Sequence, residues 1–153
     1  MTELDEFLAS FLPRLVEADT AIHVGDAEPR MRIWSRNDPV TLFGAFGPCN
    51  SGWDEVSRTF QRVASRFSSV TEFAFDLVAA GISGDLAYTV GYERSLRAVD
   101  GGPVEPSTLR VTHVYRREDG EWKIAHRHAD FLPVGQGPPG GREPRPGSGS
   151  GAA

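Results

Sequence analysis

The stretch TLRVTHVYRREDGEWKIAHRHADF, residues 108–131, decides the fold. Two runs in which apolar and polar residues alternate flank Asp119-Gly120, a dipeptide typical of the two-residue turn of a β-hairpin. Such a turn pairs the strands residue by residue, so that His113 lies opposite His126. The stretch therefore predicts two long antiparallel strands with a defined register.

One face of this hairpin is predicted to be buried because it carries most of the large apolar side chains. These are Leu109, Val111, Tyr115, Trp122 and Ile124. In the predicted register His113, His126 and His128 share this face, which places three of the four histidines on one concave surface. The opposite face carries Arg110, Thr112, Arg116, Lys123 and Arg127, and we expect it to meet solvent or a second subunit. A slip of one residue would reverse these assignments.

Outward from the hairpin, the chain divides into helices first and strands after them. Apolar residues recur with a helical period over residues 2–22, 27–34 and from residue 51 or 52 onward. Residues 40–43 are predicted to form a short strand followed by a loop over 44–52, and alternation predicts long strands over 70–82 and 86–99. This order predicts an α+β domain whose helices cover one face of a curved antiparallel sheet.

The carboxyl end of the sequence differs in composition from the rest. Of the 17 glycines and 11 prolines in the chain, seven glycines and four prolines fall in residues 135–153, which contain no aromatic residue and no aliphatic residue larger than Ala. Such a segment cannot bury a core. We therefore expect one globular domain over residues 1–134 and a disordered Gly/Pro/Ser-rich tail over 135–153.

Charge and cysteine usage exclude several classes of protein. The 16 basic and 21 acidic residues give a net charge of −5 without a basic stripe, which disfavours nucleic acid as a partner. No apolar run is long enough to cross a bilayer and the amino end lacks the pattern of a secretory signal, so we expect a cytoplasmic protein without a membrane partner. The single Cys49 excludes an internal disulfide and a multi-cysteine zinc site.

Three interpretations of the histidine cluster remain open. The imidazoles could be buried structural groups that neighbouring carboxylates or backbone atoms satisfy. They could orient or protonate a small molecule, because histidine titrates near neutral pH. A metal could also bind His126 and His128 together with His113 and either Glu93 or Asp130. Because a His-x-His pair on a strand is a weak metal signal, the sequence predicts a site without a metal or a cofactor.

Aromatic and acidic residues in the helical half add to a predicted pocket. Trp34 and Trp53 lie at the ends of helical stripes that pack on the sheet, and large flat side chains line many small-molecule cavities. Asp38 lies in a turn from which a carboxylate could reach a cavity mouth as a base. Core filling for the two tryptophans and a turn role for Asp38 are the alternatives.

Two motifs in this order of elements resemble a known family. GDLAY at residues 84–88 and YRREDGEWKIAHRH at residues 115–128, after three helices, resemble the nuclear transport factor 2-like superfamily. SnoaL-like and ketosteroid-isomerase-like proteins, and the association domain of calcium/calmodulin-dependent protein kinase II, are the most similar members. The resemblance covers residues 3–132. It implies a cystatin-like cone, in which a curved antiparallel sheet wraps around three helices and leaves a cavity, in a homodimer joined through the sheet face.

The resemblance also implies roles for two residues. It places His113 and Glu93 at inward positions, where they could form an ion pair or a proton relay. Simple alternation along residues 86–99 predicts the reverse, with Tyr88, Val90 and Tyr92 inside and Glu93 outside. Because bulges are common in such sheets, Tyr92 stays a candidate for the pocket wall.

The predicted function is the binding of a small carbonyl-bearing molecule, with proton-transfer chemistry such as isomerisation, cyclisation or dehydration. His126 or His128 would be the acid or base, oriented by His113 and Glu93, and Asp130 could pair with His128. Steroid isomerisation is disfavoured because LFGA at residues 42–45 replaces the carboxylate base expected there. The alternative is a non-catalytic module for ligand sensing or oligomerisation.

Overall fold

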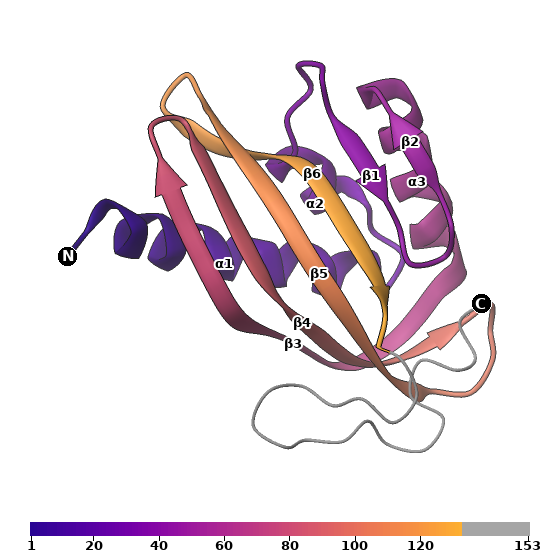
Figure 1. The fold of residues 1–153 in the computed structure, drawn as a ribbon. Helices are drawn as coiled ribbons and strands as arrows, with labels where there is room; N and C mark the ends of the chain where they lie inside the picture. The colour runs from indigo at the N-terminus through magenta and orange to yellow at the C-terminus, as the bar shows by residue number, and fades with distance from the viewer. Residues whose placement is uncertain (133–153) are drawn as a thin grey trace.

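The computed structural model describes residues 1–132 and confirms the α+β architecture. The elements are α1 (Glu3–Ile22), α2 (Glu28–Ile33), β1 (Thr41–Phe43), β2 (Cys49–Ser51), α3 (Trp53–Arg66), β3 (Phe67–Ser83), β4 (Leu86–Val99), β5 (Glu105–Glu118) and β6 (Glu121–Phe131). The strands form one curved sheet in the order β2-β1-β6-β5-β4-β3, with the helices on one side (Figure 1). The predicted tail over 135–153, and the end of the predicted domain at 134, lie outside the described residues.

Helix α1 begins with a capping box and packs along the sheet. The Thr2 hydroxyl accepts from the Asp5 amide at 3.1 Å, and the Asp5 carboxylate accepts from the Thr2 amide at 3.0 Å. The rings of Phe7 and Phe11 each lie 4.9 Å from the ring of Tyr115 on β5. The first half of α1 therefore rests on an apolar core, to which burial of each aromatic side chain contributes about 1.5–3 kcal/mol.

Several predicted boundaries differ from the structure. The predicted loop over 44–52 contains β2, which pairs with β1 in antiparallel fashion, while β1 pairs with β6 in parallel. Strand β3 begins at Phe67 rather than Val70, directly after α3, and β5 begins at Glu105 rather than Thr108. These shifts lengthen the sheet at the end that lies beyond the apolar core.

The predicted register of the β5–β6 hairpin is correct near the turn and wrong beyond it. Tyr115 pairs with Ile124 as expected, but Val114 then pairs with His126, so Ala125 is an extra residue in β6. A β-bulge of this kind inserts one residue and reverses the faces of everything after it. His113 therefore lies opposite Arg127 and not opposite His126.

The bulge also corrects the predicted faces of the hairpin. Arg127, which was expected on the outer face, is 6% exposed and lies inside the cone. His126 and His128, which were expected inside, lie on the convex outer face with Thr41 and Phe43 of β1 as their register partners. The three histidines therefore do not converge on one concave surface.

Strand β4 follows the resemblance and contradicts simple alternation. Its buried positions alternate over Ala87, Thr89, Gly91, Glu93, Ser95 and Arg97, and Ala98 beside Arg97 is buried as well. Tyr88 is exposed and Val90 and Tyr92 are half-buried on the other face. Small and polar residues occupy the inner face of β4, and the Thr89 hydroxyl forms a 2.8 Å hydrogen bond with the Tyr115 hydroxyl.

Candidate functional site

Charged side chains occupy the interior of the cone beyond the apolar core. Arg127 of β6 donates two hydrogen bonds to Glu93 of β4, at 2.6 and 2.9 Å, and both side chains are more than nine-tenths buried. Although burial alone would raise the pKa of Glu93, the Arg127 guanidinium holds that pKa far below its usual range. Both groups are therefore charged, and they form a buried ion pair across the sheet.

His113 supports this ion pair from the neighbouring strand. Its Nε2 lies 3.2 Å from an Arg127 nitrogen, and the side chain is 1% exposed. Burial and the adjacent Arg127 charge lower the pKa of His113 well below its usual value. The imidazole is therefore neutral and accepts from Arg127 at Nε2, so its proton is on Nδ1, which has no hydrogen-bond partner among residues 1–132.

A second buried ion pair connects the two amino-terminal helices. Asp19 of α1 accepts from Arg30 of α2 at 2.5 and 3.0 Å, and both side chains are at most 8% exposed. Burial raises the pKa of Asp19 to about 6, although the Arg30 charge lowers it. The second oxygen of Asp19 has no hydrogen-bond partner within the described part of the chain.

Arg97 of β4 is a buried cation of a different kind. It is 3% exposed, and one of its terminal nitrogens donates to the Ser95 hydroxyl at 3.1 Å. Its Nε has no partner, and no carboxylate among residues 1–132 forms an ion pair with it. The guanidinium carbon lies 4.8 Å from the centroid of the Phe67 ring, and burial lowers the pKa of Arg97 to about 10.

His23, directly after α1, is the fourth histidine of the chain. Its Nδ1 lies 2.5 Å from the Asp19 carbonyl oxygen, which can only accept, so Nδ1 carries the proton and Nε2 is the acceptor. Burial, with repulsion from Arg97 and Arg30, lowers its pKa to about 3. His23 and Arg97 contact the same Phe67 ring, since the imidazole centroid lies 4.7 Å from it.

These groups surround one small cavity. Its volume is about 50 Å³, which is room for a few water molecules. Its polar lining comes from His23, Arg30, Thr59, Glu93, Arg97 and Arg127, and its apolar lining includes Leu42, Phe46, Phe60, Phe67 and Leu109. The turn over residues 44–48, between β1 and β2, forms one wall. Chemically, the cavity offers guanidinium donors, the Glu93 carboxylate, the Thr59 hydroxyl and one neutral imidazole acceptor.

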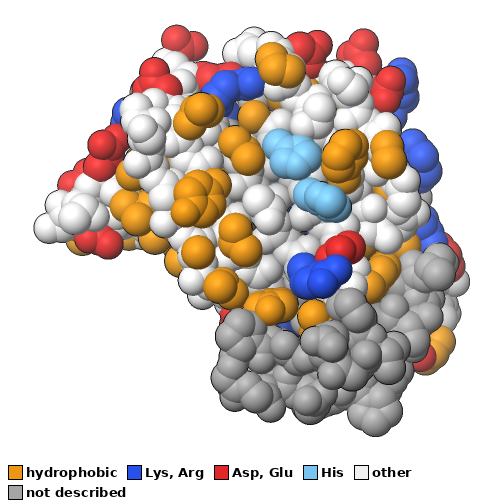
Figure 2. All heavy atoms as spheres, viewed as in Figure 1, with side chains coloured by type: hydrophobic (Ala, Val, Ile, Leu, Met, Phe, Trp, Pro, Cys, Tyr) orange, Lys and Arg blue, Asp and Glu red, His pale blue; other side chains and the backbone are white. Residues whose placement is uncertain are grey.

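The predicted acid–base residues of β6 lie on the opposite side of the sheet. His126 Nδ1 lies 2.7 Å from the Thr41 hydroxyl, and the rings of His126 and His128 both meet the Phe43 ring edge-on. Figure 2 shows two neighbouring imidazoles on this face among hydrophobic side chains. Burial and the nearby His128 lower the pKa of His126. Neither imidazole lines the interior cavity.

Asp130 and Tyr92 also lie on the outer face. Asp130 accepts two hydrogen bonds from Arg110, at 2.5 and 2.7 Å, which lower its pKa. With His128, these residues line a groove of about 280 Å³ over β4 and β5. The metal-ligand set considered for the three histidines is thus split between two faces of the sheet. Residues 1–132 contain no group of three or more His, Cys, Asp or Glu that could hold a metal ion.

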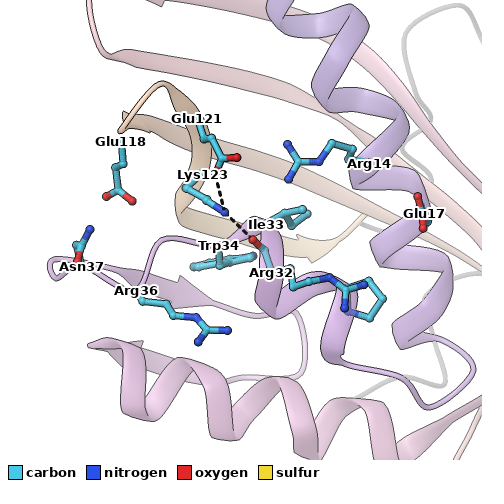
Figure 3. A pocket seen from close by; sticks show the side chains of 11 residues that line it. Arg14, Glu17, Arg32, Ile33, Trp34, Arg36, Asn37, Glu118, Glu121 and Lys123 are labelled. Atoms are coloured by element: carbon cyan, nitrogen blue, oxygen red, sulfur yellow. Dashed lines mark hydrogen bonds and ion pairs between the residues drawn. The ribbon is translucent and has the colours of Figure 1, made fainter.

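The predicted aromatic walls lie elsewhere. Trp34 is 2% exposed, and its ring meets the Phe60 ring at 4.9 Å, edge-on. It forms part of the floor of a surface pocket of about 580 Å³ between α1, α2 and the β5–β6 turn (Figure 3). In that pocket Lys123 donates to the Arg32 carbonyl at 2.9 Å, and the residues include both basic and acidic side chains.

Trp53 and Asp38 interact at the first residue of α3. The Asp38 carboxylate accepts from the Trp53 amide at 3.0 Å, where the helix leaves an amide without an internal partner. Neither residue lines the interior cavity, and Glu93 is the one predicted site residue that does. The roles predicted for Trp34, Trp53, Asp38 and Tyr92 remain predictions.

Sequence reasoning missed most of the charged residues of the cavity. Arg127 was assigned to the wrong face because of the bulge, and Arg30 and Arg97 were not singled out. A signal existed for Asp19 and His23. They continue the apolar stripe of α1 from Leu15 at intervals of four residues, so polar groups stand at positions expected to be buried.

Comparisons with known proteins agree with this architecture. Residues 15–133 match the SnoaL-like domain family. F-box protein SKIP8 of Arabidopsis thaliana is 27% identical over 101 residues, or 66% of this chain, and the chain spans 40% of the length of that plant protein. No helix of residues 1–132 is long and apolar enough to cross a membrane.

Solved structures show the same fold at low sequence identity. A candidate dehydratase of the NTF2-like family from Streptomyces avermitilis has a TM-score of 0.64 and 22% identity, over 80% of this chain and 97% of that one. A candidate calcium/calmodulin-dependent protein kinase II association domain from Xanthomonas campestris has a TM-score of 0.61 and 17% identity, over 87% and 90% of the two chains. With the family match over most of its length, the chain belongs to the SnoaL-like domain family and has the fold of NTF2-like proteins.

Proposed function

We propose that this SnoaL-like domain binds a small carbonyl-bearing molecule in the cavity inside the cone. The proposal rests on one observation. Two buried polar side chains, Arg97 of β4 and His23 at the end of α1, line the same cavity. A core that served only packing would place apolar side chains at these positions, because buried polar groups without partners reduce stability.

The volume of the cavity limits the ligand. Pockets for drug-sized molecules usually measure about 300–1,000 Å³, whereas this cavity measures about 50 Å³. A molecule of a few heavy atoms fits the cavity as it stands. A larger one requires the turn over residues 44–48 to move, and the turn is held to itself by the hydrogen bonds between Gly44 and Pro48 and between Gly47 and Gly44, each of 3.0 Å.

Proton-transfer chemistry in this cavity would use His23 rather than His126 or His128. Nε2 of the neutral His23 imidazole would take a proton from the carbon next to the ligand carbonyl, and a guanidinium would stabilise the enolate oxygen that forms. The enolate charge would favour the protonated imidazole, which offsets the effect of burial on its pKa. The proton would then return to carbon or to oxygen.

Binding is tested by nuclear magnetic resonance with acetone and cyclohexanone as probes. We expect the largest amide shift changes at residues 22–23, 42–46 and 93–97, around the cavity. Largest changes on the outer face near His128 would refute the interior site and favour the groove over β4 and β5.

Catalysis is tested by following the exchange of acetone protons for deuterium in heavy water. His23→Gln is expected to remove the catalysed exchange, while His128→Gln should keep it. Loss of exchange in His128→Gln alone would place the chemistry on the outer face. Bound acetone without catalysed exchange in the wild type would support a binding module and refute the proton-transfer part.

A second proposal concerns the convex face of the sheet, which we infer to be covered by a second copy of the chain. Its exposed large hydrophobic side chains are Phe43, Val78, Leu86 and Tyr88, with 44–53% of their surface accessible. The charged groups between them already form neutral pairs, Arg110 with Asp130 and Arg94 with Asp76. A face of apolar side chains and neutralised charges matches an identical face related by a twofold axis.

The dimer is tested by sedimentation of two matched variants. Val78→Glu, on the sheet face and 51% exposed, is expected to give monomers. Val24→Glu, 56% exposed and located after α1, is the control and should leave the dimer intact. A wild-type protein that sediments as a monomer at micromolar concentration would contradict the proposal.

A further inference from the structure

The interior of the cone carries one positive charge more than its own residues neutralise. Its three guanidinium groups belong to Arg30, Arg97 and Arg127, and its two carboxylates belong to Asp19 and Glu93. Arg30 is paired with Asp19, and Arg127 with Glu93. Among residues 1–132, the unmatched cation is therefore Arg97.

No carboxylate among residues 1–132 forms an ion pair with Arg97, although the Glu93 charge partly offsets the effect of burial on it. Its register partner on β5 is Glu105, which is exposed and forms no ion pair with it in the described part of the chain. The guanidinium contacts the Ser95 hydroxyl and the rings of Phe67 and Phe46, and its Nε–H is left without an acceptor among residues 1–132. Because a buried charge without a counterion strongly opposes folding, such a group indicates a ligand that supplies the missing charge.

We propose that the cavity binds the carboxylate of a small monocarboxylic acid and that Arg97 holds this carboxylate. This inference rests on the proposed binding function and names the chemical class of the ligand. The planar guanidinium fork, with Nε–H unpaired, matches a planar carboxylate. The single excess positive charge of the cavity matches the single negative charge of a monocarboxylate, whereas a phosphate dianion carries two negative charges.

His23 adds a second recognition element at the same ring of Phe67. Its acceptor Nε2 suits a hydroxyl or other donor on the carbon skeleton of the acid. A carboxylate in the cavity would also neutralise the charge that repels protonation of His23. A carboxylate bound in the cavity would thus balance the charge of Arg97.

The experiment compares acetate with acetamide, which has the same shape without the charge. Nitrogen–proton spectra of the arginine Nε–H groups, with the Arg97 signal identified by Arg97→Lys, report binding directly. Acetate is expected to shift the Arg97 Nε–H signal, and to bind at least tenfold more tightly than acetamide. Phosphate is expected to bind more weakly than acetate.

Variants separate this inference from the proposed function. Arg97→Gln is expected to fold, because it removes an uncompensated charge, and to weaken acetate binding at least tenfold, a larger factor than its effect on acetamide binding. Arg94→Gln on the outer face of the same strand is the matched control and should bind acetate as the wild type does.

Three results would overturn the inference. If acetamide shifts the cavity residues as strongly as acetate, the cavity binds small molecules without using charge, and only the carboxylate inference fails. If phosphate binds more tightly than acetate, the ligand class is wrong. If neither acetate nor acetamide shifts the cavity residues, both this inference and the proposed function fail.

Discussion

Replacing Glu93 by Gln tests the energetic role of the charged interior. The change keeps the shape of the side chain but leaves Arg127 buried without its counterion, beside Arg97, which already lacks one. Breaking a buried ion pair by removing one partner costs about 3–5 kcal/mol. For a domain of this size, the melting temperature should fall by about 10–20 °C.

The outer face provides a matched control. Arg110 and Asp130 form an ion pair of similar geometry, but their side chains are each 48% exposed, against 8% and 3% for Arg127 and Glu93. An exposed pair contributes about 0–1 kcal/mol, so Asp130→Asn should change little. Urea unfolding followed by tryptophan fluorescence measures both. A loss for Glu93→Gln no larger than that for Asp130→Asn would refute the assignment of the pair to a desolvated interior.

Three further predictions follow from individual contacts. His23 is neutral in the folded state, with a pKa of about 3 against about 6.5 in the unfolded chain. Its contribution to the free energy of unfolding is therefore complete above pH 6.5 and is lost as the pH falls toward 3. His23→Gln should therefore reduce the slope of unfolding free energy against pH between about 4 and 6 by about 1.4 kcal/mol per pH unit, measured by urea titration; an unchanged slope would show that the imidazole is not buried neutral. Asp38→Ala should cost about 1 kcal/mol and speed amide hydrogen exchange in the first turn of α3, and protection equal to the wild type would contradict its capping role. Deletion of Ala125 should lower the free energy of unfolding by less than Glu93→Gln does, because it removes the extra residue and leaves His126 opposite Val114 and Arg127 opposite His113; a loss in urea unfolding as large as that of Glu93→Gln would contradict the assignment of Ala125 as the extra residue.

The helices, the long strands and the hairpin turn could be predicted because each depends on local patterns. The apolar stripe from Phe7 to Ile22 requires a helix of that length, and Asp119-Gly120 requires a tight turn. These signals are complete within a few residues of sequence. The fold class followed from their order.

The face of each residue beyond the bulge could not be predicted in the same way. Ala125 carries no signal of its own, since a small residue fits a regular strand as well as a bulge. The bulge arises from the curvature that the sheet needs to wrap around the helices, which is a property of all six strands together. One extra residue places Arg127 inside the cone and His126 and His128 outside it. The acid–base chemistry predicted for the two histidines in the interior therefore does not apply there.

The position of the charged residues within the cone is itself an argument for a ligand. Helix α1 begins on an apolar core at Phe7 and Phe11 and ends on polar groups at Asp19 and His23, so one helix crosses from ordinary packing to a region that breaks the apolar pattern. Sequences break such patterns where function requires it, because each buried charge lowers stability unless something compensates it. Two of the three interior arginines have protein carboxylates as partners, and the third, Arg97, faces the cavity. The uncompensated charge of Arg97 therefore lies at the cavity, and a negatively charged ligand that binds there would stabilise the folded state.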